Sequence, residues 1–226
     1  MIRIENLKKS YDGHLVLDHI NLELQGGRVY GLVGENGSGK TTLFKCISGL
    51  EPYEGLISSD LVLLKNHLGY LQTEPYFFPK ITGREYLQLL CNARGCEQPN
   101  FDQKNIFDLP LDHYAVTYST GMKKKLALTA ILCQKNQYYI LDEPYNGVDI
   151  QSNIIITEII HELKRLNKTI LISSHIFSTL RDTCDEIHLL QKGKIIQKVE
   201  RSSFDALETE MKRFSIGNRI KQLQLS

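Results

Sequence analysis

Apolar and charged residues alternate along the N-terminal part of the chain, which is typical of β-strands that bury one face. The alternation begins at residue 2 and resumes over residues 15–24, after the turn-forming pair Asp12-Gly13. A short apolar run over residues 28–33 leads into a glycine-rich loop, and residues 41–50 have the pattern of a helix. The pattern predicts an antiparallel β part, followed by a strand, a loop and a helix.

Helical spacing of apolar residues marks the middle of the chain. One helix is predicted around residues 87–93 and another around residues 122–131. Residues 95–110, between them, are polar and irregular. Residues 74–135 therefore predict a helical subdomain inserted into the β-rich part.

The strand pattern returns after this subdomain. Strand, helix and strand are predicted in this order over residues 138–141, 154–166 and 169–172. This order is typical of a parallel sheet covered by helices. Residues 187–199 predict a hairpin that turns around Lys192-Gly193, and residues 201–226 predict a weak helix or a tail.

These elements predict a single α/β domain over residues 1–226, with a mostly parallel sheet as its core. The core comprises residues 1–73 and 136–200, the helical subdomain residues 74–135, and the tail residues 201–226. A chain of 226 residues with 42% hydrophobic and 23% charged residues is typical of a soluble globular protein. Its core is large enough to be stable without disulfides.

Charge and cysteine content argue against several classes of protein. The net charge of +1, from 27 basic and 26 acidic residues, predicts no nucleic-acid partner and no polybasic membrane anchor. The five cysteines include no CxxC pair, so we expect buried, reduced thiols in a cytosolic protein. The N-terminus does not resemble a signal peptide, and no apolar run approaches the ~18 residues of a membrane span.

A phosphate-binding loop is predicted after the strand of residues 28–33. Its sequence matches the pattern G-x-x-x-x-G-K-[ST] in full, as Gly34-Glu35-Asn36-Gly37-Ser38-Gly39-Lys40-Thr41, and Thr42 completes the predicted nucleotide-binding stretch. Glycines allow several backbone N–H groups to point inward at an anion, and the helix that follows adds its dipole. We expect Lys40 to reach the β- and γ-phosphates and the Thr41 hydroxyl to bind Mg²⁺.

Two carboxylates follow the apolar strand of residues 138–141. Ligands of an open parallel sheet bind at the carboxyl ends of its strands, so Asp142 is predicted to bind the Mg²⁺ that Thr41 holds. Glu143 is predicted to polarise an attacking water as a general base. Such a pair by itself often only begins a polar loop, but the phosphate loop upstream favours the catalytic interpretation.

Together these residues resemble the nucleotide-binding domain of the ABC transporter family, in order and over nearly the whole chain. The resemblance implies a P-loop NTPase fold of ABC type. It also implies that Tyr11 stacks on adenine, that Gln72 contacts Mg²⁺ and the attacking water, and that His175 contacts the γ-phosphate and aligns the water with Glu143. Without this resemblance, the default interpretation is a turn residue for Tyr11, a solvated side chain for Gln72 and a structural histidine for His175.

Residues 118–122 resemble the family signature, usually LSGGQ, and differ from it by Tyr118, Thr120 and Met122. The retained Ser119 and Gly121 offer a hydroxyl and a bare backbone N–H at a helix start to a γ-phosphate. Met122 is included among the predicted nucleotide-binding residues. The three lysines at positions 123–125 are typical of a solvated helix face. Residues 146–149 are similar to the family's D-loop and match it at Asp149.

The resemblance also implies an assembly. Ser119 and Gly121 would close over ATP bound by a second nucleotide-binding subunit, identical or related, and a transmembrane permease subunit would carry the substrate. The implied function is ATP binding and hydrolysis that powers transport, at the cytoplasmic face of the cell membrane. The aromatic segment of residues 75–79 either packs in the helical subdomain or borders a groove for the membrane subunit.

Three alternatives share part of these motifs. An ABC-type ATPase of DNA repair carries long coiled-coil or zinc insertions, whereas the stretch between Gln72 and Ser119 is short. A nucleotide kinase or GTP-binding switch shares only the phosphate loop. A regulatory ABC protein usually carries two such domains in one chain.

Overall fold

The structure is a computed structural model that describes residues 1–175 and 177–209. Strands β1 (Ile2–Tyr11) and β2 (His14–Leu24) pair antiparallel, and β4 (Glu54–Ser59) pairs with the other edge of β1. The predicted turn between β1 and β2 is confirmed, since Asp12 and Gly13 have φ angles of 48° and 80°. The sequence did not predict β4, because its residues are mostly exposed and carry no apolar stripe.

A six-stranded sheet forms the centre of the molecule, in the order β5-β6-β7-β3-β8-β9. Its strands are β3 (Val29–Val33), β5 (Leu68–Leu71), β6 (Tyr138–Asp142), β7 (Thr169–Ser173), β8 (Glu186–Gln191) and β9 (Lys194–Glu200). All neighbours in this sheet are parallel except β8 and β9, which form the predicted hairpin. Every residue of β3, β6 and β7 is buried, which explains their continuous apolar runs.

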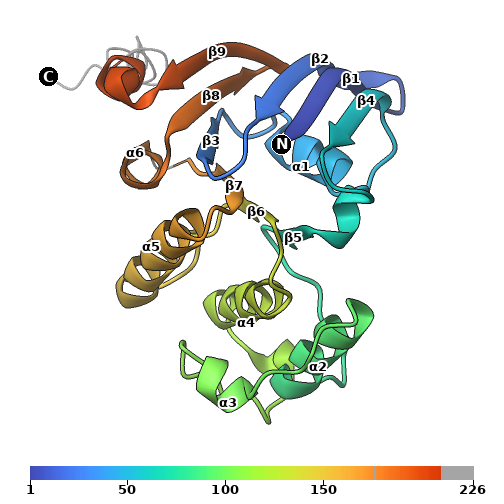
Figure 1. The fold of residues 1–226 in the computed structure, drawn as a ribbon, viewed down its shortest axis with the longest axis vertical. Helices are drawn as coiled ribbons and strands as arrows, with labels where there is room; N and C mark the ends of the chain where they lie inside the picture. Colours follow the sequence, from blue (N-terminus) through green and yellow to red (C-terminus); the bar gives the residue numbers. More distant parts are fainter. Residues whose placement is uncertain (176, 210–226) are drawn as a thin grey trace, which may run out of the picture.

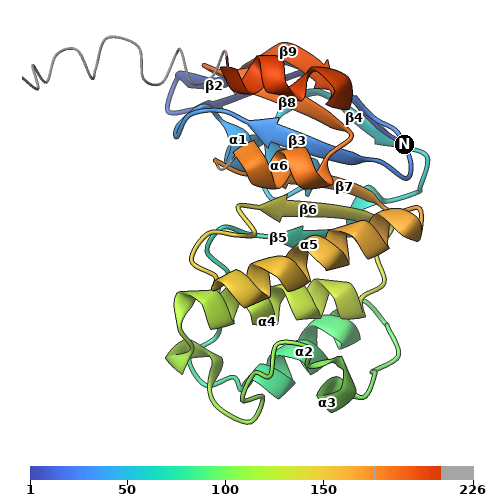
Figure 2. The same ribbon diagram turned by 90° about the vertical axis from the view of Figure 1, so that its left-hand side faces the viewer.

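Helices cover the sheet and extend beyond one end of it. Those that pack on the strands are α1 (Lys40–Ile47), α4 (Thr120–Cys133), α5 (Ile150–Arg165) and α6 (Phe177–Thr183). The other two, α2 (Gly83–Ala93) and α3 (Phe101–Lys104), lie beyond α4 at the lower end of Figures 1 and 2. Short 3-10 turns are η1 (Leu64–Asn66), η2 (Ala115–Thr117) and η3 (Arg201–Ser203). Within the described residues, no helix is long and apolar enough to span a membrane.

Residues 95–110 differ from the irregular polar stretch that was predicted. They contain α3, and Phe101, Phe107 and Leu109 are buried in the larger apolar core. These side chains are too widely spaced to produce a helical or strand period, so only their packing reveals them. The predicted tail is described only as far as residue 209, and the rest of it lies outside the described residues.

The six-stranded sheet separates two apolar cores. Tyr139 and Leu141 of β6 belong to the core that includes α4 and α5, whereas Tyr138 and Ile140 belong to the core formed with α1, β1 and β2. Successive residues of a strand point to opposite faces, so packing on both faces fixes each strand. The carboxyl ends of β3, β6 and β7 are thereby held in place, and the candidate site is built on them.

Candidate functional site

The predicted phosphate loop joins the end of β3 to the start of α1. Gly37 and Gly39 have φ angles of 82° and 109°, which strain residues that carry a side chain. A Cβ atom at Gly34 would lie 2.2 Å from the carbonyl oxygen of Leu190 in β8. The loop therefore needs glycine at these positions in order to curl and to pass β8.

Lys40 lies within the curl of this loop. Its Nζ donates hydrogen bonds to the carbonyl oxygens of Gly34 over 2.8 Å and Glu35 over 3.2 Å. Burial lowers the pKa of Lys40, and the carboxylates of Glu143 and Asp142 oppose that shift. The ammonium group is thus held in a partly desolvated place where an anionic ligand gains from its charge.

A buried hydroxyl indicates that the loop fits an anion. Ser38 Oγ is buried and has no hydrogen-bond partner among the residues that the structure describes. A buried donor without a partner costs free energy, and an anionic oxygen bound in the loop would accept its hydrogen. The loop therefore fits the phosphate groups of a nucleotide.

Thr41 and Asp142 form the predicted metal-binding pair. Thr41 Oγ1 donates a hydrogen bond to Asp142 Oδ2 over 2.7 Å, and Ser173 Oγ donates to Asp142 Oδ1 over 2.6 Å. Hydroxyl and carboxylate oxygens are suitable ligands for Mg²⁺, which usually takes few protein ligands and completes its shell with water and phosphate oxygens. The described part of the chain contains no group of three His, Cys, Asp or Glu side chains that could hold a metal.

Glu143 and His175 contact each other at the carboxyl ends of β6 and β7. His175 Nδ1 lies 2.7 Å from Glu143 Oε2, and the backbone N–H of His175 donates to the same oxygen over 3.3 Å. Glu143 has a φ angle of 52°, and its own N–H donates to Ser173 Oγ over 3.0 Å. This left-handed backbone is uncommon for a residue with a side chain, and such conformations often occur at functional sites.

One cavity of about 620 Å³ connects these groups. The predicted residues that line it are Tyr11, Asn36, Gly37, Gly39, Lys40, Thr41, Thr42, Asp142, Glu143 and His175. Val16, Thr73 and Asn146 also line it, although the sequence did not predict them as binding residues. Val16 belongs to the alternation of β2 and Thr73 follows Gln72, so neither carries a signal of its own.

Four residues predicted for the phosphate and metal site do not line this cavity, namely Gly34, Glu35, Ser38 and Gln72. Gln72 borders an adjacent cavity of about 440 Å³ together with Thr41 and Thr73, which places it beside the predicted metal ligand. Glu35 takes part through its backbone, since its carbonyl oxygen accepts hydrogen bonds from Lys40 Nζ and from the N–H of Ser38 over 3.2 and 3.1 Å.

Tyr11 stands at the edge of the 620 Å³ cavity, at the end of β1, and is 37% exposed. Lys9 Nζ lies 4.5 Å from the centre of the Tyr11 ring, a cation–π distance, and forms an ion pair with Glu51 over 3.1 Å. Lys9 thus covers one face of the ring. The stacking of adenine on Tyr11 stays a prediction, and we expect it on the face of the ring opposite Lys9.

The signature residues lie at the start of α4 and do not line the cavity of their own chain. Ser119 is the N-cap of α4 and accepts a hydrogen bond from the N–H of Met122 over 3.2 Å. A Cβ atom at Gly121 would lie 2.6 Å from the carbonyl oxygen of Gly147, so the helix packs tightly on the D-loop. Asp149 of that loop caps α5.

The lysine run after the signature is buried at its middle residue, so the prediction of a solvated helix face is wrong for Lys124. Lys124 is 2% exposed, and its Nζ donates to the carbonyl oxygens of Glu143 over 2.7 Å and Asn146 over 2.9 Å. Lys125 pairs with Asp149 over 3.2 Å. The sequence could not show this, because the loop after β6 that covers this side of α4 is distant along the chain.

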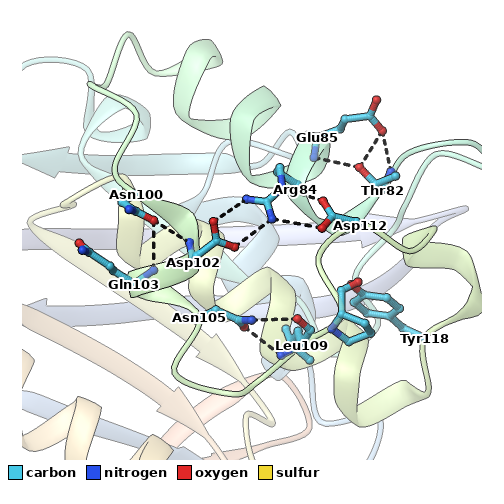
Figure 3. Close-up of polar contacts among 11 residues, drawn as sticks. Thr82, Arg84, Glu85, Asn100, Asp102, Gln103, Asn105, Leu109, Asp112 and Tyr118 are labelled. Atoms are coloured by element: carbon cyan, nitrogen blue, oxygen red, sulfur yellow. Dashed lines mark hydrogen bonds and ion pairs between the residues drawn. The ribbon is translucent and has the colours of Figure 1, made fainter.

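A polar network at the start of α2 holds the segment that leads to the signature (Figure 3). Arg84 donates to Asp112 over 2.7 Å and to Asp102 of α3 over 2.9 Å. Hydrogen bonds with Asp112 and Asp102 raise the pKa of Arg84. The Tyr118 hydroxyl donates to the carbonyl oxygen of Pro110 over 2.6 Å. No pattern in the sequence indicates this role of Arg84, because its partners share no motif with it.

The aromatic segment of residues 75–79 has one buried ring and two exposed rings. Phe77 is buried and packs on Tyr86 of α2, with ring centres 4.5 Å apart. Tyr76 and Phe78 are 70% and 53% exposed and contact each other. Packing in the helical subdomain is therefore confirmed for Phe77, and Phe78 points to the surface.

Comparisons with known proteins agree with this fold and identify its family. The family model described as ABC transporter matches residues 17–146. The bacitracin transport ATP-binding protein BcrA of Enterococcus faecalis is 32% identical, over 96% of this chain and 75% of the relative. The lantibiotic transport ATP-binding protein SrtF of Streptococcus pyogenes is 32% identical, over 92% of this chain and 94% of the relative.

Solved structures have the same architecture. The ATP-binding subunit of an ABC transporter matches with a TM-score of 0.84 and 26% identity, over 93% of this chain and 99% of the other. A dimeric ATP-binding cassette in a post-hydrolysis state with ADP and Pi matches with a TM-score of 0.78 and 19% identity, over 89% and 99% of the two chains, and shows the fold alone.

The chain therefore belongs to the ABC transporter family, as its ATP-binding subunit. As a member of this family it binds ATP with Mg²⁺ and hydrolyses it to drive transport. The comparisons do not favour the non-transport alternatives.

Proposed function

We propose that the chain hydrolyses ATP with Glu143 as general base and with His175 as the group that aligns Glu143 and the attacking water. The contact of 2.7 Å between His175 Nδ1 and Glu143 Oε2, in a cavity that Lys40 also lines, supports this assignment most directly. Glu143 takes a proton from the water that attacks the γ-phosphorus, and the bond from this phosphorus to the bridging oxygen breaks, so that ADP leaves. His175 restrains the carboxylate, and Lys40 stabilises negative charge on the phosphate oxygens.

The remaining site residues bind the substrate and the metal. Backbone N–H groups of residues 34–42 hold the phosphates, and Tyr11 contacts adenine. Thr41 and Asp142 hold Mg²⁺ with the help of Gln72, and the bound ion neutralises charge on the phosphate oxygens. The hydrogen bond between Thr41 and Asp142 and the unpartnered Ser38 hydroxyl support these assignments.

Ser119, Gly121 and Met122 serve the nucleotide of a second subunit. They begin α4, where backbone N–H groups and the helix dipole favour an anion, and none of them lines the cavity of its own chain. ATP then lies between two subunits and holds them together, and hydrolysis releases the pair. This is a two-state equilibrium that the nucleotide biases.

The groove between the sheet and the helical subdomain receives the membrane subunit. Tyr70, Gln72, Tyr76, Tyr86 and Arg94 are among its lining residues. Arg94 Nη1 is buried there with no hydrogen-bond partner among the described residues, so the groove favours a segment with a carboxylate. Docking at this groove places the chain in the cytoplasm, on the inner face of the cell membrane.

Crosslinking tests this groove. Tyr76→Cys, at an exposed residue that lines the groove, is expected to crosslink to a cytoplasmic segment of the co-expressed permease. Glu158→Cys, on the exposed face of α5, serves as the control and is expected not to crosslink. Equal crosslinking of both variants would place the permease elsewhere.

The general base is tested by Glu143→Gln. The amide keeps the size of the side chain and removes its basicity, so ATP turnover is expected to fall by about 100-fold or more, while the affinity for MgATP changes little. The control is Glu158→Gln, an exposed glutamate of α5 with the same change of charge. Glu143 is not the general base if the variant retains turnover or loses nucleotide binding.

The subunit contact is tested by Ser119→Arg. The long cation would occupy the space of the γ-phosphate at the shared interface, so ATP-driven dimerisation of the Glu143→Gln protein is expected to disappear in size-exclusion chromatography. A dimer that persists would remove Ser119 from the interface.

We also propose the division into a core of residues 1–73 and 136–200 and a helical subdomain of residues 74–135.

The transported substrate is suggested by the names of relatives. Two of these names concern bacitracin transport and lantibiotic transport, and a third concerns linearmycin resistance. Antibiotics of this kind are therefore the first cargo to test. The growth of cells that express the chain with its permease would be compared with that of Glu143→Gln cells.

A further inference from the structure

Lys124 occupies an unusual position for a lysine. It lies in the first half of α4, five residues after Ser119, and it is among the largest side chains that are almost completely buried. Its ammonium group donates to two backbone carbonyl oxygens, those of Glu143 and Asn146. It therefore joins the signature helix to the loop that carries the candidate general base.

A buried ammonium group carries a large desolvation cost, so its position needs compensation. Burial lowers the pKa of Lys124, while the charges of Glu143, Asp142 and Glu74 act in the opposite direction. The two carbonyl oxygens, at 2.7 and 2.9 Å, accept two of the three ammonium hydrogens. An apolar residue would fill this place at lower cost, but it would leave both carbonyl oxygens without a donor.

The hydrogen bonds of Lys124 constrain the backbone of Glu143. The N–H of Glu143 donates to Ser173, and its carbonyl oxygen accepts from Lys124, so both polar backbone groups of the residue are held. This residue has the uncommon φ angle of 52°, which persists only when its surroundings fix it. Asn146, the second acceptor, lines the nucleotide cavity.

A second contact couples the same two elements. Gly121, in the first turn of α4, packs against the carbonyl oxygen of Gly147 so closely that no Cβ atom fits between them. A displacement of α4 must therefore move the loop of residues 143–147 as well. This segment and α4 behave as one packed unit.

We propose that Lys124 is a positioning residue. When the nucleotide of a second subunit binds against Ser119 and Gly121, Lys124 transmits the displacement of α4 to the backbone of Glu143. ATP bound by one subunit thereby aligns the general base of the other. This inference rests on the proposed role of Glu143. Lys124 itself touches neither the nucleotide nor the attacking water.

The test replaces Lys124 by glutamine and by arginine. A misplaced general base is expected to lower kcat by about 100-fold in Lys124→Gln, with little change in KM for MgATP. ATP-driven dimerisation is expected to persist, because Ser119 and Gly121 are unchanged. Lys124→Arg keeps the charge and the donors on a wider group, so its kcat is expected to lie between those of the glutamine variant and the unchanged protein.

The neighbouring lysine provides a matched control. Lys123→Gln removes the same charge from the same helix, and no hydrogen bond or ion pair of the Lys123 side chain is found within the described residues. Its kcat is expected to stay within about twofold of the unchanged protein, in keeping with the small effects typical of surface substitutions.

Several outcomes would overturn the proposal. One is a kcat of Lys124→Gln within twofold of the unchanged protein, and another is a loss of dimerisation that accompanies the loss of turnover. If Lys124→Gln does not fold, Lys124→Met decides, because it removes the donors and keeps the length of the side chain, and a kcat within twofold of the unchanged protein in that variant rejects the positioning role. Turnover that survives in Glu143→Gln would instead reject the proposed general base, so the two failures are distinguishable.

Discussion

The hydroxyl of Thr41 donates a hydrogen bond of 2.7 Å to Asp142, although 101 positions separate the two residues along the chain. Thr41 lies in the first turn of α1 and Asp142 ends β6, and both elements pack on the apolar core that includes β1 and β2. The pair brings the end of the phosphate loop to the acidic end of a neighbouring strand. This juxtaposition makes one site from two motifs, and its consequences are testable.

Dependence on Mg²⁺ is expected to change in Asp142→Asn. The amide has the shape of the carboxylate without its charge, so the Mg²⁺ concentration for half-maximal turnover should rise by about 10–100-fold. Titration of ATPase activity with Mg²⁺ measures this shift, and chelation of the metal should abolish turnover of the unchanged protein. Glu158→Gln is the control for the loss of a carboxylate. An unchanged Mg²⁺ dependence in Asp142→Asn would exclude a role in holding the metal.

Gly34→Ala is expected to destabilise the chain and to weaken nucleotide binding together. The new Cβ atom would lie 2.2 Å from the Leu190 carbonyl oxygen, and a backbone neighbour does not give way easily. Overpacking of this kind lowers the free energy of unfolding by about 1–3 kcal/mol, which urea denaturation measures. Gly26→Ala is the control, because an added Cβ meets no atom within 4 Å there. Equal stability of the two variants would contradict the close approach of the loop to β8.

Arg84→Met is expected to weaken ATP-driven dimerisation without changing ATP binding by the single subunit. The substitution removes the donors that hold Asp102 and Asp112, and the segment before Ser119 loses its anchor on α2. We expect a several-fold increase in the protein concentration needed for the dimer and faster proteolysis within residues 100–118. Arg165→Met is the control, because Arg165 pairs only within its own helix, with Glu162, among the described residues. A dimer as stable as that of the control would show that Arg84 has no part in positioning the signature.

Thiol reactivity is expected to be confined to Cys96 near pH 8. Burial raises the pKa of Cys46 and Cys133 to about 11 and that of Cys184 to about 12, and it also raises the pKa of Cys91. A thiol with a pKa near 11 is only about 0.1% thiolate at pH 8, and the thiolate is the reactive form. Cys96 is less buried than the other four.

Alkylation with iodoacetamide followed by mass spectrometry of the peptides measures this difference. The buried thiols should react faster as the pH rises towards 11, and Cys96→Ser should remove the fast reaction at pH 8. Labelling of Cys133 as fast as Cys96 in the folded protein would contradict the burial of this thiol.

The sequence by itself determined the local parts of this protein. The phosphate loop was predictable because Gly37 and Gly39 permit a backbone that other residues resist, and because Lys40 and Thr41 follow at a fixed spacing. The central strands were predictable because strands buried on both faces are continuously apolar. These signals come from residues adjacent in the chain, and the physical constraint acts within one turn or one strand.

Only the tertiary structure decided how these parts act on one another. The sequence favoured a solvated Lys124, but the loop after β6 covers this lysine and supplies its two acceptors. Arg84 and its partners belong to three segments that share no pattern, and folding alone brings them together. The physical reason is that burial and hydrogen bonding depend on which distant segment covers a side chain, and the periodicity of a single segment contains no information about that neighbour.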